Sequence, residues 1–292
     1  MEEKGKKTKV ISIINLKGGV GKTQMTVALA EFLAMEYEKR VLLIDLDPQT
    51  NATVLLMDEE EWLRKDQKGE TLLQLFKDKL EGTSRFDINQ AIKRRASNVG
   101  RGINNLDLLP SSLGLIEIQD SLPLISGKQF HLTTPVTILK EAISGILEEY
   151  DFVLIDCPPS LGIITLNGIY ISDYYLIPCI PDILSTYGIP QILNRVENFK
   201  KVAKINIEPL GIVISMYRAQ SRLHKTTIQE LRNRASRGEY PRIFNTIIPL
   251  TVRSAEAADF NAEVNTLKQK YGYPTVYEDY QNLTRELLSY VT

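Results

Sequence analysis

The sequence has little cysteine and no long apolar run. Its two cysteines, Cys157 and Cys179, lie within apolar stretches, and neither has the CxxC spacing or the Cys/His partner of a zinc or iron–sulfur site. The same scarcity excludes a disulfide framework and fits a reducing cytosol. The first residues, MEEKGKKTKV, lack the long apolar core of a signal peptide. No stretch reaches the roughly 18 apolar residues of a membrane-spanning helix.

A charge imbalance is lacking as well. The 292 residues carry a formal net charge of −1, with 43% hydrophobic and 24% charged residues, as is ordinary for a soluble globular protein. The overall charge therefore indicates no acidic partner, and any nucleic-acid surface must be a local patch. Because we find no linker rich in proline, glycine or serine and no repeat, we expect one domain over residues 1–292.

Short apolar runs alternate with helical patterns. The runs are apolar at every position, which is typical of strands buried on both faces of a parallel sheet. They are Val10–Ile14, Val41–Ile44, Phe152–Ile155, Tyr174–Ile177, Leu210–Ile214 and Ile243–Ile248. Residues 25–33 and 189–202 have helical apolar spacing, with Pro190 expected in the first turn of the second helix. This alternation predicts an α/β fold with a doubly wound, mostly parallel sheet flanked by helices.

The stretch from about residue 57 to residue 129 is the least regular part of the sequence. It is polar and charged, with weak helical patches only at 72–76 and 113–118. We expect it to form an irregular peripheral insertion on the sheet.

The segment NLKGGVGKTQM, residues 15–25, follows an apolar strand and opens a helix, as a phosphate-binding loop does. Gly21, Lys22 and Thr23 match the end of the pattern G-x-x-x-x-G-K-[ST], but Lys17 stands where the first glycine is expected. The glycines let backbone N–H groups turn toward phosphate oxygens at a helix N-terminus. Lys22 would reach the β- and γ-phosphates, and the Thr23 hydroxyl would ligate Mg²⁺. The alternative is a plain glycine turn with solvated lysines. The candidate nucleotide-binding residues of this loop are Gly18, Gly19, Val20, Gly21, Lys22, Thr23 and Gln24.

Three aspartates follow two of the expected strands. Asp45 and Asp47 lie in VLLIDLDPQTNAT, and Asp156 lies in FVLIDCPPS. Ligands of open α/β sheets bind at these strand ends. Asp45 and Asp156 therefore join Thr23 as candidates for Mg²⁺, directly or through water, whereas Asp47 would orient and deprotonate the attacking water. Each aspartate alone has a plain alternative as a helix cap or turn residue.

Four ordered motifs resemble one known family. KGGVGKT, LLIDLDPQTNAT, LIDCPPSLGIITLNGI and NTIIPLTVRSAEA look like those of the deviant Walker A ATPases of the ParA type, which position plasmids, chromosomes and some large protein cargoes in bacteria. The resemblance runs from about Lys9 to Phe260. It implies a P-loop NTPase fold, ATP and Mg²⁺ as cofactors, and slow ATP hydrolysis that a partner stimulates.

The resemblance also implies roles for single residues. Lys17 matches the signature lysine, which crosses the interface of an ATP-sandwich homodimer and contacts the partner's nucleotide. Burying two triphosphates face to face requires added positive charge, so this role is physically reasonable. Asp47 matches the hydrolytic aspartate and Asp156 the Walker B carboxylate. Met216 and Pro249 fall in segments that lie near the adenine base in relatives.

The sequence departs from the family pattern at several positions. Thr50 replaces the usual glycine of DPQGNAT, and Gln24 and Met25 replace the usual threonines after GKT. The segment PDILSTYG lacks the glutamate that relatives often have. These departures bear on the rate and the partner interface more than on the fold. We also expect a short form that lacks an N-terminal DNA-reading domain.

Basic residues concentrate between positions 218 and 253. This segment contains eight lysines and arginines but only two acidic residues, Glu230 and Glu239, which gives a local charge of +6. A solvated helix face is the plain alternative, but the resemblance implies non-specific binding to double-stranded DNA, which would depend on the phosphate backbone. His224 in this segment and His131 outside it lack ligand-like spacing, and we expect both to be structural. The candidate DNA-binding residues are Arg218, Arg222, Lys225, Arg232, Arg234 and Arg253.

The resulting hypothesis is an ATP-dependent dimerising switch in the nucleoid-containing cytoplasm. It would bind DNA, partition plasmid or chromosomal DNA, and respond to a centromere-binding, ParB-like adaptor. One alternative keeps the switch but moves a protein cargo over the nucleoid. Another, a MinD-like membrane ATPase, needs a basic amphipathic C-terminal helix, and the tail NLTRELLSYVT is barely basic. A tyrosine kinase would use the C-terminal tyrosines, which we expect to pack a final helix instead, and a redox reductase would need cluster-binding cysteines.

Overall fold

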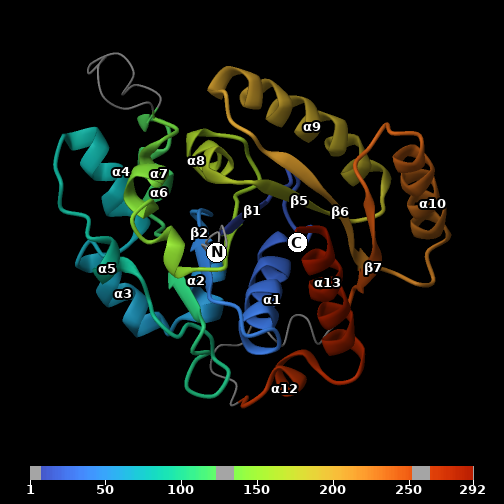
Figure 1. Ribbon diagram of the computed structural model, residues 1–292, viewed down its shortest axis with the longest axis horizontal. Helices are drawn as coiled ribbons and strands as arrows, with labels where there is room; N and C mark the ends of the chain where they lie inside the picture. Colours follow the sequence, from blue (N-terminus) through green and yellow to red (C-terminus); the bar gives the residue numbers. More distant parts are fainter. Residues whose placement is uncertain (1–7, 123–134, 252–263, 292) are drawn as a thin grey trace, which may run out of the picture.

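Seven parallel strands form the centre of the protein (Figure 1). The computed structural model describes residues 8–122, 135–251 and 264–291. The strand order is β3-β2-β4-β1-β5-β6-β7, and every neighbouring pair is parallel. This arrangement confirms the predicted doubly wound parallel sheet. The strands are β1 (Lys9–Ile13), β2 (Val41–Asp45), β3 (Leu106–Leu109), β4 (Phe152–Asp156), β5 (Tyr174–Cys179), β6 (Glu208–Tyr217) and β7 (Ile243–Pro249).

Two apolar cores lie on opposite faces of this sheet. Successive residues of a strand point to opposite faces, so Val41 and Leu43 join one core while Leu42 and Ile44 join the other. Both cores are covered by helices, which explains why the strands are apolar at every position. The first core is packed by α1 (Lys22–Met35), α2 (Asn51–Leu56), α3 (Glu59–Gln67), α12 (Leu267–Tyr271) and α13 (Thr275–Val291). The second is packed by α4 (Leu72–Glu81), α5 (Ile88–Ala91), α6 (Leu115–Ile118), α7 (Ile138–Ile143), α8 (Ile163–Ile171), α9 (Ile183–Ala203) and α10 (Arg222–Ser236).

The stretch expected to be an irregular insertion contributes a strand to the sheet. Strand β3 pairs with β2 in the register Val41↔Leu106 to Ile44↔Leu109 and forms one edge. The prediction of irregular structure is therefore wrong for these four residues. The strand was missed because its sequence, LDLL, is very short and contains Asp107. The Asp107 carboxylate is held by an ion pair with Arg94 at 2.7 Å and by the Tyr150 hydroxyl at 2.9 Å.

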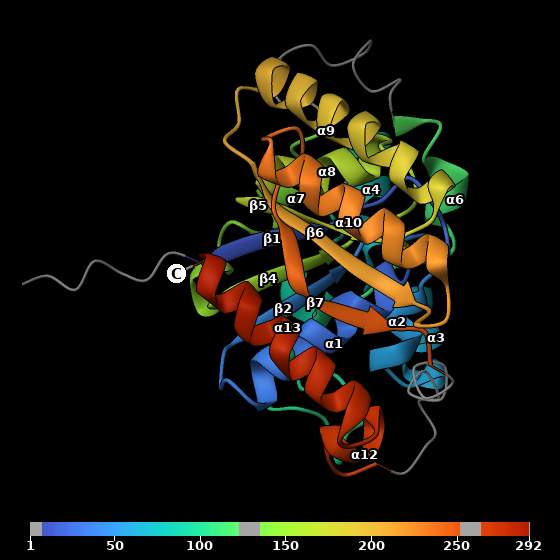
Figure 2. The ribbon, with the colours of Figure 1, turned by 90° about the vertical axis from the view of Figure 1, so that its right-hand side faces the viewer.

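Most of the C-terminal tyrosines pack as expected, whereas Tyr273 is 61% exposed. Tyr271, Tyr277 and Tyr280 are buried, and their rings surround Phe32 of α1 at centroid distances of 5.4, 5.2 and 6.2 Å. Helix α13 also runs alongside β7 at the other edge of the sheet, as Figure 2 shows. These contacts agree with the expected packing role of Tyr271, Tyr277 and Tyr280, and they connect the C-terminal helices to the helix that follows the phosphate loop.

Helix α9 begins earlier than predicted. It starts at Ile183, where the Asp182 side chain caps it by accepting from the Ser185 N–H at 2.7 Å. Pro190 therefore lies inside the helix, and its prediction in the first turn is wrong. In the described parts of the chain, no helix has both the length and the apolar character needed to span a membrane.

Candidate nucleotide site

A pocket of about 570 Å³ opens at the carboxyl ends of the central strands. The loop after β1, the loop after β2 and the first turns of α1 and α2 surround it, and Met216 near the end of β6 contributes to one side. This is where ligands bind in open α/β sheets. The lining residues are Gly18, Gly19, Gly21, Lys22, Thr23, Gln24, Val27, Asp47, Gln49, Asn51, Val54, Leu55, Pro159, Met216, Lys270 and Tyr271.

The phosphate loop has the backbone conformation that its glycines allow. Gly19 and Gly21 have φ angles of 72° and 81°, in the left-handed region that side chains other than glycine rarely adopt. Gly21 directly precedes α1, so the positive end of a 14-residue helix faces the pocket. The loop therefore presents backbone N–H groups and a helix dipole to an anion.

Lys22 places a buried positive charge in this pocket. Lys22 is only 6% exposed, and its ammonium group donates to the Lys17 carbonyl oxygen at 3.4 Å. Burial lowers the pKa of Lys22, while the nearby carboxylates of Asp156 and Asp47 act in the opposite direction. A phosphate group bound here would supply the negative charge that favours the protonated lysine.

Asp156 carries an unsatisfied oxygen beside the phosphate loop. The residue is fully buried, and its Oδ1 accepts from the Thr26 hydroxyl at 3.3 Å. Among the residues that the structure describes, its Oδ2 is buried and has no hydrogen-bond partner. Burial raises the pKa of Asp156 to about 7, although a hydrogen bond from Thr23 and the charge of Lys22 work against this shift. An orphaned carboxylate oxygen next to the Thr23 hydroxyl fits Mg²⁺ or one of its water ligands.

Asp45 ends β2 as predicted, but both of its side-chain oxygens are engaged within the protein. Its Oδ1 accepts from the Asp47 N–H at 3.1 Å, and its Oδ2 accepts from the N–H and hydroxyl of Thr53 at 2.8 and 2.7 Å. Burial raises the pKa of this carboxyl group well above its ordinary value. Both oxygens are engaged and the residue does not line the pocket, so this geometry does not favour a direct metal contact, and the role of Asp45 in Mg²⁺ binding, directly or through water, stays a prediction. The spacing that placed it after a strand does not reveal the direction of its side chain.

Asp47, in contrast, lines the pocket. Its residue is 6% exposed, and its Oδ1 accepts from the Gln49 N–H at 2.9 Å. The carboxylate therefore sits on the wall that also contains Lys22 and Thr23. This position is suitable for a group that orients a water molecule against a bound phosphate.

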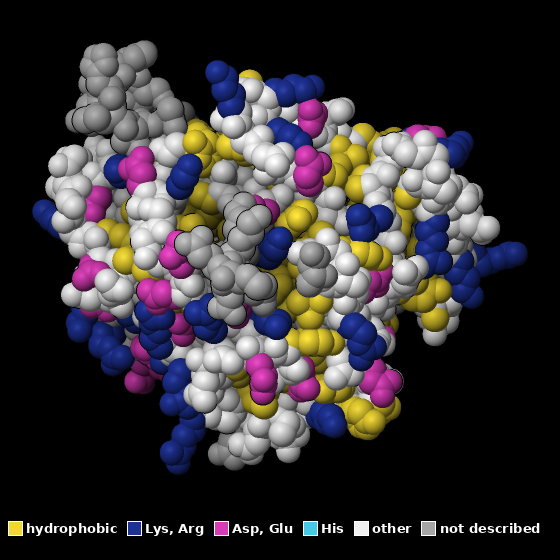
Figure 3. All heavy atoms as spheres, in the orientation of Figure 1, with side chains coloured by type: hydrophobic (Ala, Val, Ile, Leu, Met, Phe, Trp, Pro, Cys, Tyr) yellow, Lys and Arg dark blue, Asp and Glu magenta, His cyan; other side chains and the backbone are white. Residues whose placement is uncertain are grey.

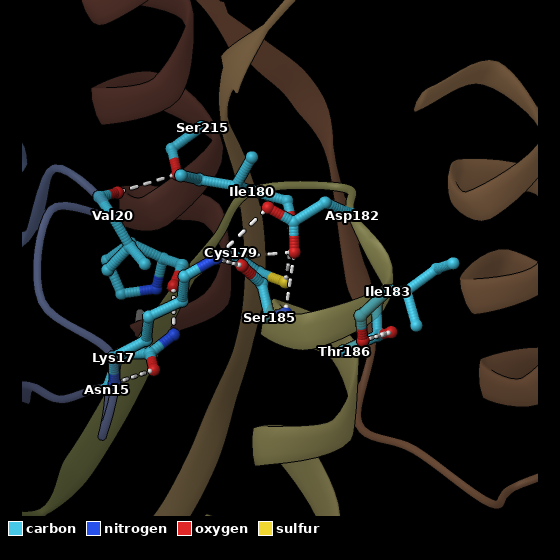
Figure 4. Close-up of polar contacts among 11 residues, drawn as sticks. Asn15, Lys17, Val20, Cys179, Ile180, Asp182, Ile183, Ser185, Thr186 and Ser215 are labelled. Carbon is cyan, nitrogen blue, oxygen red and sulfur yellow. Dashed lines mark hydrogen bonds and ion pairs between the residues drawn. The ribbon is translucent and has the colours of Figure 1, made fainter. Parts of the chain in front are cut away.

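Lys17 does not line the pocket of its own chain. Figure 4 shows its side chain reaching across to the start of α9, where its ammonium lies 3.1 Å from Asp182 Oδ2 and 3.0 Å from Ser185 Oγ. Its backbone N–H donates to Asn15 Oδ1 at 2.9 Å, which holds the front of the loop. Sequence reasoning missed Asp182 and Ser185 as partners, although an aspartate directly before a helical pattern is a recognisable cap signal.

The remaining loop and adenine-side candidates differ in their placement. Gln24 and Met216 line the pocket as predicted. Val20 is fully buried, and its carbonyl oxygen accepts from the Ser215 hydroxyl at 2.8 Å, so it holds the loop against β6 rather than facing the pocket. Pro249 is paired with Tyr217 at the end of β7, close in the sheet to Met216, but it is not a lining residue.

The basic segment forms a strongly charged face of α10. Its apolar side contacts the second core through Ile228 and Leu231, and the opposite side carries its basic residues, which Figure 3 shows at the right of the molecule. Within the described residues, five of the segment's basic side chains are exposed and have no ion-pair partner. They are Arg218, Arg222, Lys225, Arg232 and Arg242, of which Arg242 lies over the Tyr290 ring at 4.2 Å.

Other members of the segment are placed differently. Arg234 bonds to Glu239 at 2.9 Å and to the Tyr240 hydroxyl at 2.7 Å, so its guanidinium is engaged within the chain, which does not favour the DNA contact predicted for it. Arg253 and His131 lie outside the described residues. His224 is buried, and its Nδ1 accepts from the Arg218 N–H at 3.1 Å, which is a structural contact.

Comparison with known proteins gives a consistent result. Residues 8–209 match the family described as an AAA domain. The chain is 32% identical over 250 residues to the sporulation initiation inhibitor protein Soj of Bacillus subtilis, covering 85% of this chain and 87% of Soj. It is 29% identical over 259 residues to the chromosome partitioning protein ParA of Myxococcus xanthus, covering 88% and 80%. A solved structure of cobyrinic acid a,c-diamide synthase from Mycobacterium smegmatis, with bound ADP and magnesium, is similar with a TM-score of 0.71 and 25% identity, covering 96% and 94%.

Proposed function

The chain belongs to the ParA-type partition ATPases of the ParA/MinD superfamily, and on this basis we propose that it is a switch that ATP converts into a DNA-binding homodimer. It is an ATPase that uses ATP and Mg²⁺. The proposed cargo is plasmid or chromosomal DNA, and the proposed place of action is the nucleoid within the cytoplasm. The observation that supports the proposal is that the two lysines of the loop lie in different places. Lys22 lines the pocket, whereas Lys17 lies outside it and contacts Asp182.

Residues that line the pocket, together with the buried Asp156 beside the phosphate loop, would divide the work of hydrolysis. Lys22 and the loop N–H groups would hold the β- and γ-phosphates, because both offer positive charge in a partly desolvated setting. Thr23 and Asp156 would hold Mg²⁺, which when bound neutralises phosphate charge. Asp47 would orient the attacking water and accept its proton.

Lys17 would act in the partner's site. Its contact with Asp182 is partly open to solvent, with side-chain exposures of 37% and 28%. An ion pair of this kind is worth about 1 kcal/mol or less, so a triphosphate can compete for the lysine. Dimerisation would then depend on nucleotide, because two facing triphosphates need the two added lysines to offset their repulsion.

DNA would bind along the exposed basic face of α10. Arg218 lies two residues after Met216, so the chain that borders the nucleotide pocket continues directly into this face. A dimer would align two such faces on one duplex and bring more phosphate contacts than a monomer. A centromere-binding, ParB-like adaptor is the proposed partner that stimulates hydrolysis.

Gel-shift binding to random-sequence duplex DNA tests this function. The protein should bind with ATP and Mg²⁺, and much more weakly with ADP or without nucleotide. Matched duplexes of different sequence should bind equally, since phosphate contacts carry no sequence information. Equal binding in all nucleotide states would contradict the switch, and an absence of binding in every state would contradict DNA as the ligand.

A further inference from the structure

Four buried residues form a ring that connects the edge strand β3 to the catalytic loop. Asp45 ends β2, Asp47 lies in the following loop, Thr53 belongs to α2, and Ser111 follows β3. Three of them are fully buried, and Asp47 is 6% exposed. Ser111 is the only one of the four that comes from the stretch expected to be peripheral.

Hydrogen bonds close the ring. The Thr53 hydroxyl donates to Asp45 Oδ2 at 2.7 Å, and the Ser111 N–H donates to Thr53 Oγ1 at 3.0 Å. The Ser111 hydroxyl donates to the Asp47 carbonyl oxygen at 2.8 Å, and the Asp47 N–H donates to Asp45 Oδ1 at 3.1 Å. The backbone of Asp47 is therefore held on both its donor and its acceptor side.

The catalytic loop needs this support because of Thr50. This residue has a φ angle of 57°, which is unfavourable for a β-branched side chain. The strain of such a conformation is on the order of 1–2 kcal/mol. Within the loop, the Asp47 carbonyl oxygen accepts only from the Thr50 N–H at 2.9 Å. The Ser111 hydroxyl supplies the second bond from outside the loop.

We propose that Ser111 is a positioning residue for ATP hydrolysis, which holds Asp47 so that its carboxylate faces the pocket. This inference rests on the proposed role of Asp47. A displacement of about 1 Å in a reacting group can lower a rate by about 100-fold. Ser111 provides one of two bonds to the Asp47 carbonyl, so we expect about a tenfold loss in kcat when its hydroxyl is removed.

The structure provides its own reporter for this segment. Trp62 is the single tryptophan of the chain, and its buried indole N–H donates to the Ser111 carbonyl oxygen at 3.0 Å. Tryptophan emission therefore reports whether the segment after β3 keeps its place when a side chain is changed.

The first test compares two neighbouring serines in the full-length chain. Ser111→Ala should lower kcat about tenfold, leave the KM for ATP within about twofold, and leave tryptophan emission unchanged. Ser112→Ala is the matched control, because Ser112 is also fully buried but, within the described part of the chain, its hydroxyl has one hydrogen bond, from the Gly114 N–H at 3.1 Å. Its kcat should stay within about twofold of the original. Equal kcat losses in the two variants, or an unchanged kcat in Ser111→Ala, would overturn the inference.

The second test uses Thr53. It tests the positioning role of the ring even if Ser111→Ala disturbs tryptophan emission. Thr53→Val removes the hydroxyl at nearly constant shape and should lower kcat, whereas Thr53→Ser keeps the hydroxyl and should restore most of it. In the double variant Ser111→Ala/Thr53→Val, the fold-loss in kcat should be clearly smaller than the product of the two single fold-losses, because both substitutions act through one ring. Fully independent losses, or failure of Thr53→Ser to exceed Thr53→Val, would contradict the ring.

Asp47→Ala separates this inference from the proposed function. If Asp47→Ala hydrolyses ATP normally, the proposed role of Asp47 is wrong. If Asp47→Ala is inactive and Ser111→Ala is normal, only the positioning role of Ser111 is wrong.

Discussion

The phosphate loop and helix α10 both present positive charge, but in opposite physical settings. Lys22 is 6% exposed, sits among backbone donors, and has its pKa lowered by burial. Arg222 and Lys225 project from α10 into solvent. Water and salt screen exposed charges strongly, whereas the interaction of a buried charge with its ligand is screened much less. One substitution in the loop, at Lys22, should therefore abolish tight ATP binding. Each substitution on α10 should weaken DNA binding by a small, additive step.

The largest effect is expected for Lys22→Ala. The variant loses a positive charge and its hydrogen bonds to the β- and γ-phosphates, which together are worth about 3 kcal/mol or about 100-fold in ATP affinity. Isothermal calorimetry with ATP and Mg²⁺ measures this change, and Lys225→Ala, from the exposed face, is the matched control. Retained ATP affinity in Lys22→Ala would show that the loop does not bind phosphate through this lysine.

Asp47→Ala should separate binding from chemistry within the loop region. A general base typically contributes a factor of at least about 100, so hydrolysis should fall by that amount while ATP binding and dimerisation persist. Phosphate release and light scattering with ATP measure the two properties on the same sample. A variant that no longer dimerises with ATP would show that Asp47 has a structural role instead.

These two regions also differ in how far the sequence predicts them. Most of the loop was predictable, because the phosphate cradle depends on local backbone geometry that glycines and strand–helix order reveal. The inward packing of Val20 against Ser215 and the contact of Lys17 with Asp182 were not predictable, because they depend on other strands and helices of the fold. The direction of Asp45 was not predictable, since it depends on Thr53 and on Ser111 after a strand too short to recognise. On α10, the sequence predicts the charge but not its use. Arg234 is occupied by Glu239 and Tyr240, contacts that only the fold brings together.

Lys17→Ala tests a lysine that belongs to the loop in sequence but not to its pocket. Single-site ATP binding should change little, because Lys17 does not line the pocket of its own chain. The ATP-dependent dimer should weaken by at least about tenfold, since each site loses a charged contact worth roughly 1.5–3 kcal/mol. Light scattering with a non-hydrolysable ATP analogue measures the dimer.

Asp182→Asn is the matched control for this lysine. It removes the negative charge that holds Lys17 within the chain and keeps the size of the cap residue. The dimer should be at least as strong as in the original protein, because Lys17 becomes free to reach the partner's nucleotide. If Lys17→Ala dimerises normally, the role in the partner's site is wrong.

The smallest single effects are expected on α10, where they decide whether this face binds DNA. A dimer carries two copies of each side chain, so Arg222→Ala should remove about two phosphate contacts and lower the log–log salt slope of DNA binding by roughly 1.8. Binding should weaken equally for all sequences, and ATP turnover without DNA should stay unchanged, because Arg222 lies outside the nucleotide pocket.

Arg234→Ala is the informative comparison. The Arg234 guanidinium is engaged within the chain, so this substitution should leave the salt slope of DNA binding nearly unchanged. Equal slopes for the original protein and for the Arg218, Arg222, Lys225 and Arg232 variants would place the DNA surface elsewhere. Lys204 is then the next candidate, because Lys200 and Lys201 are paired with Glu208 and Glu197.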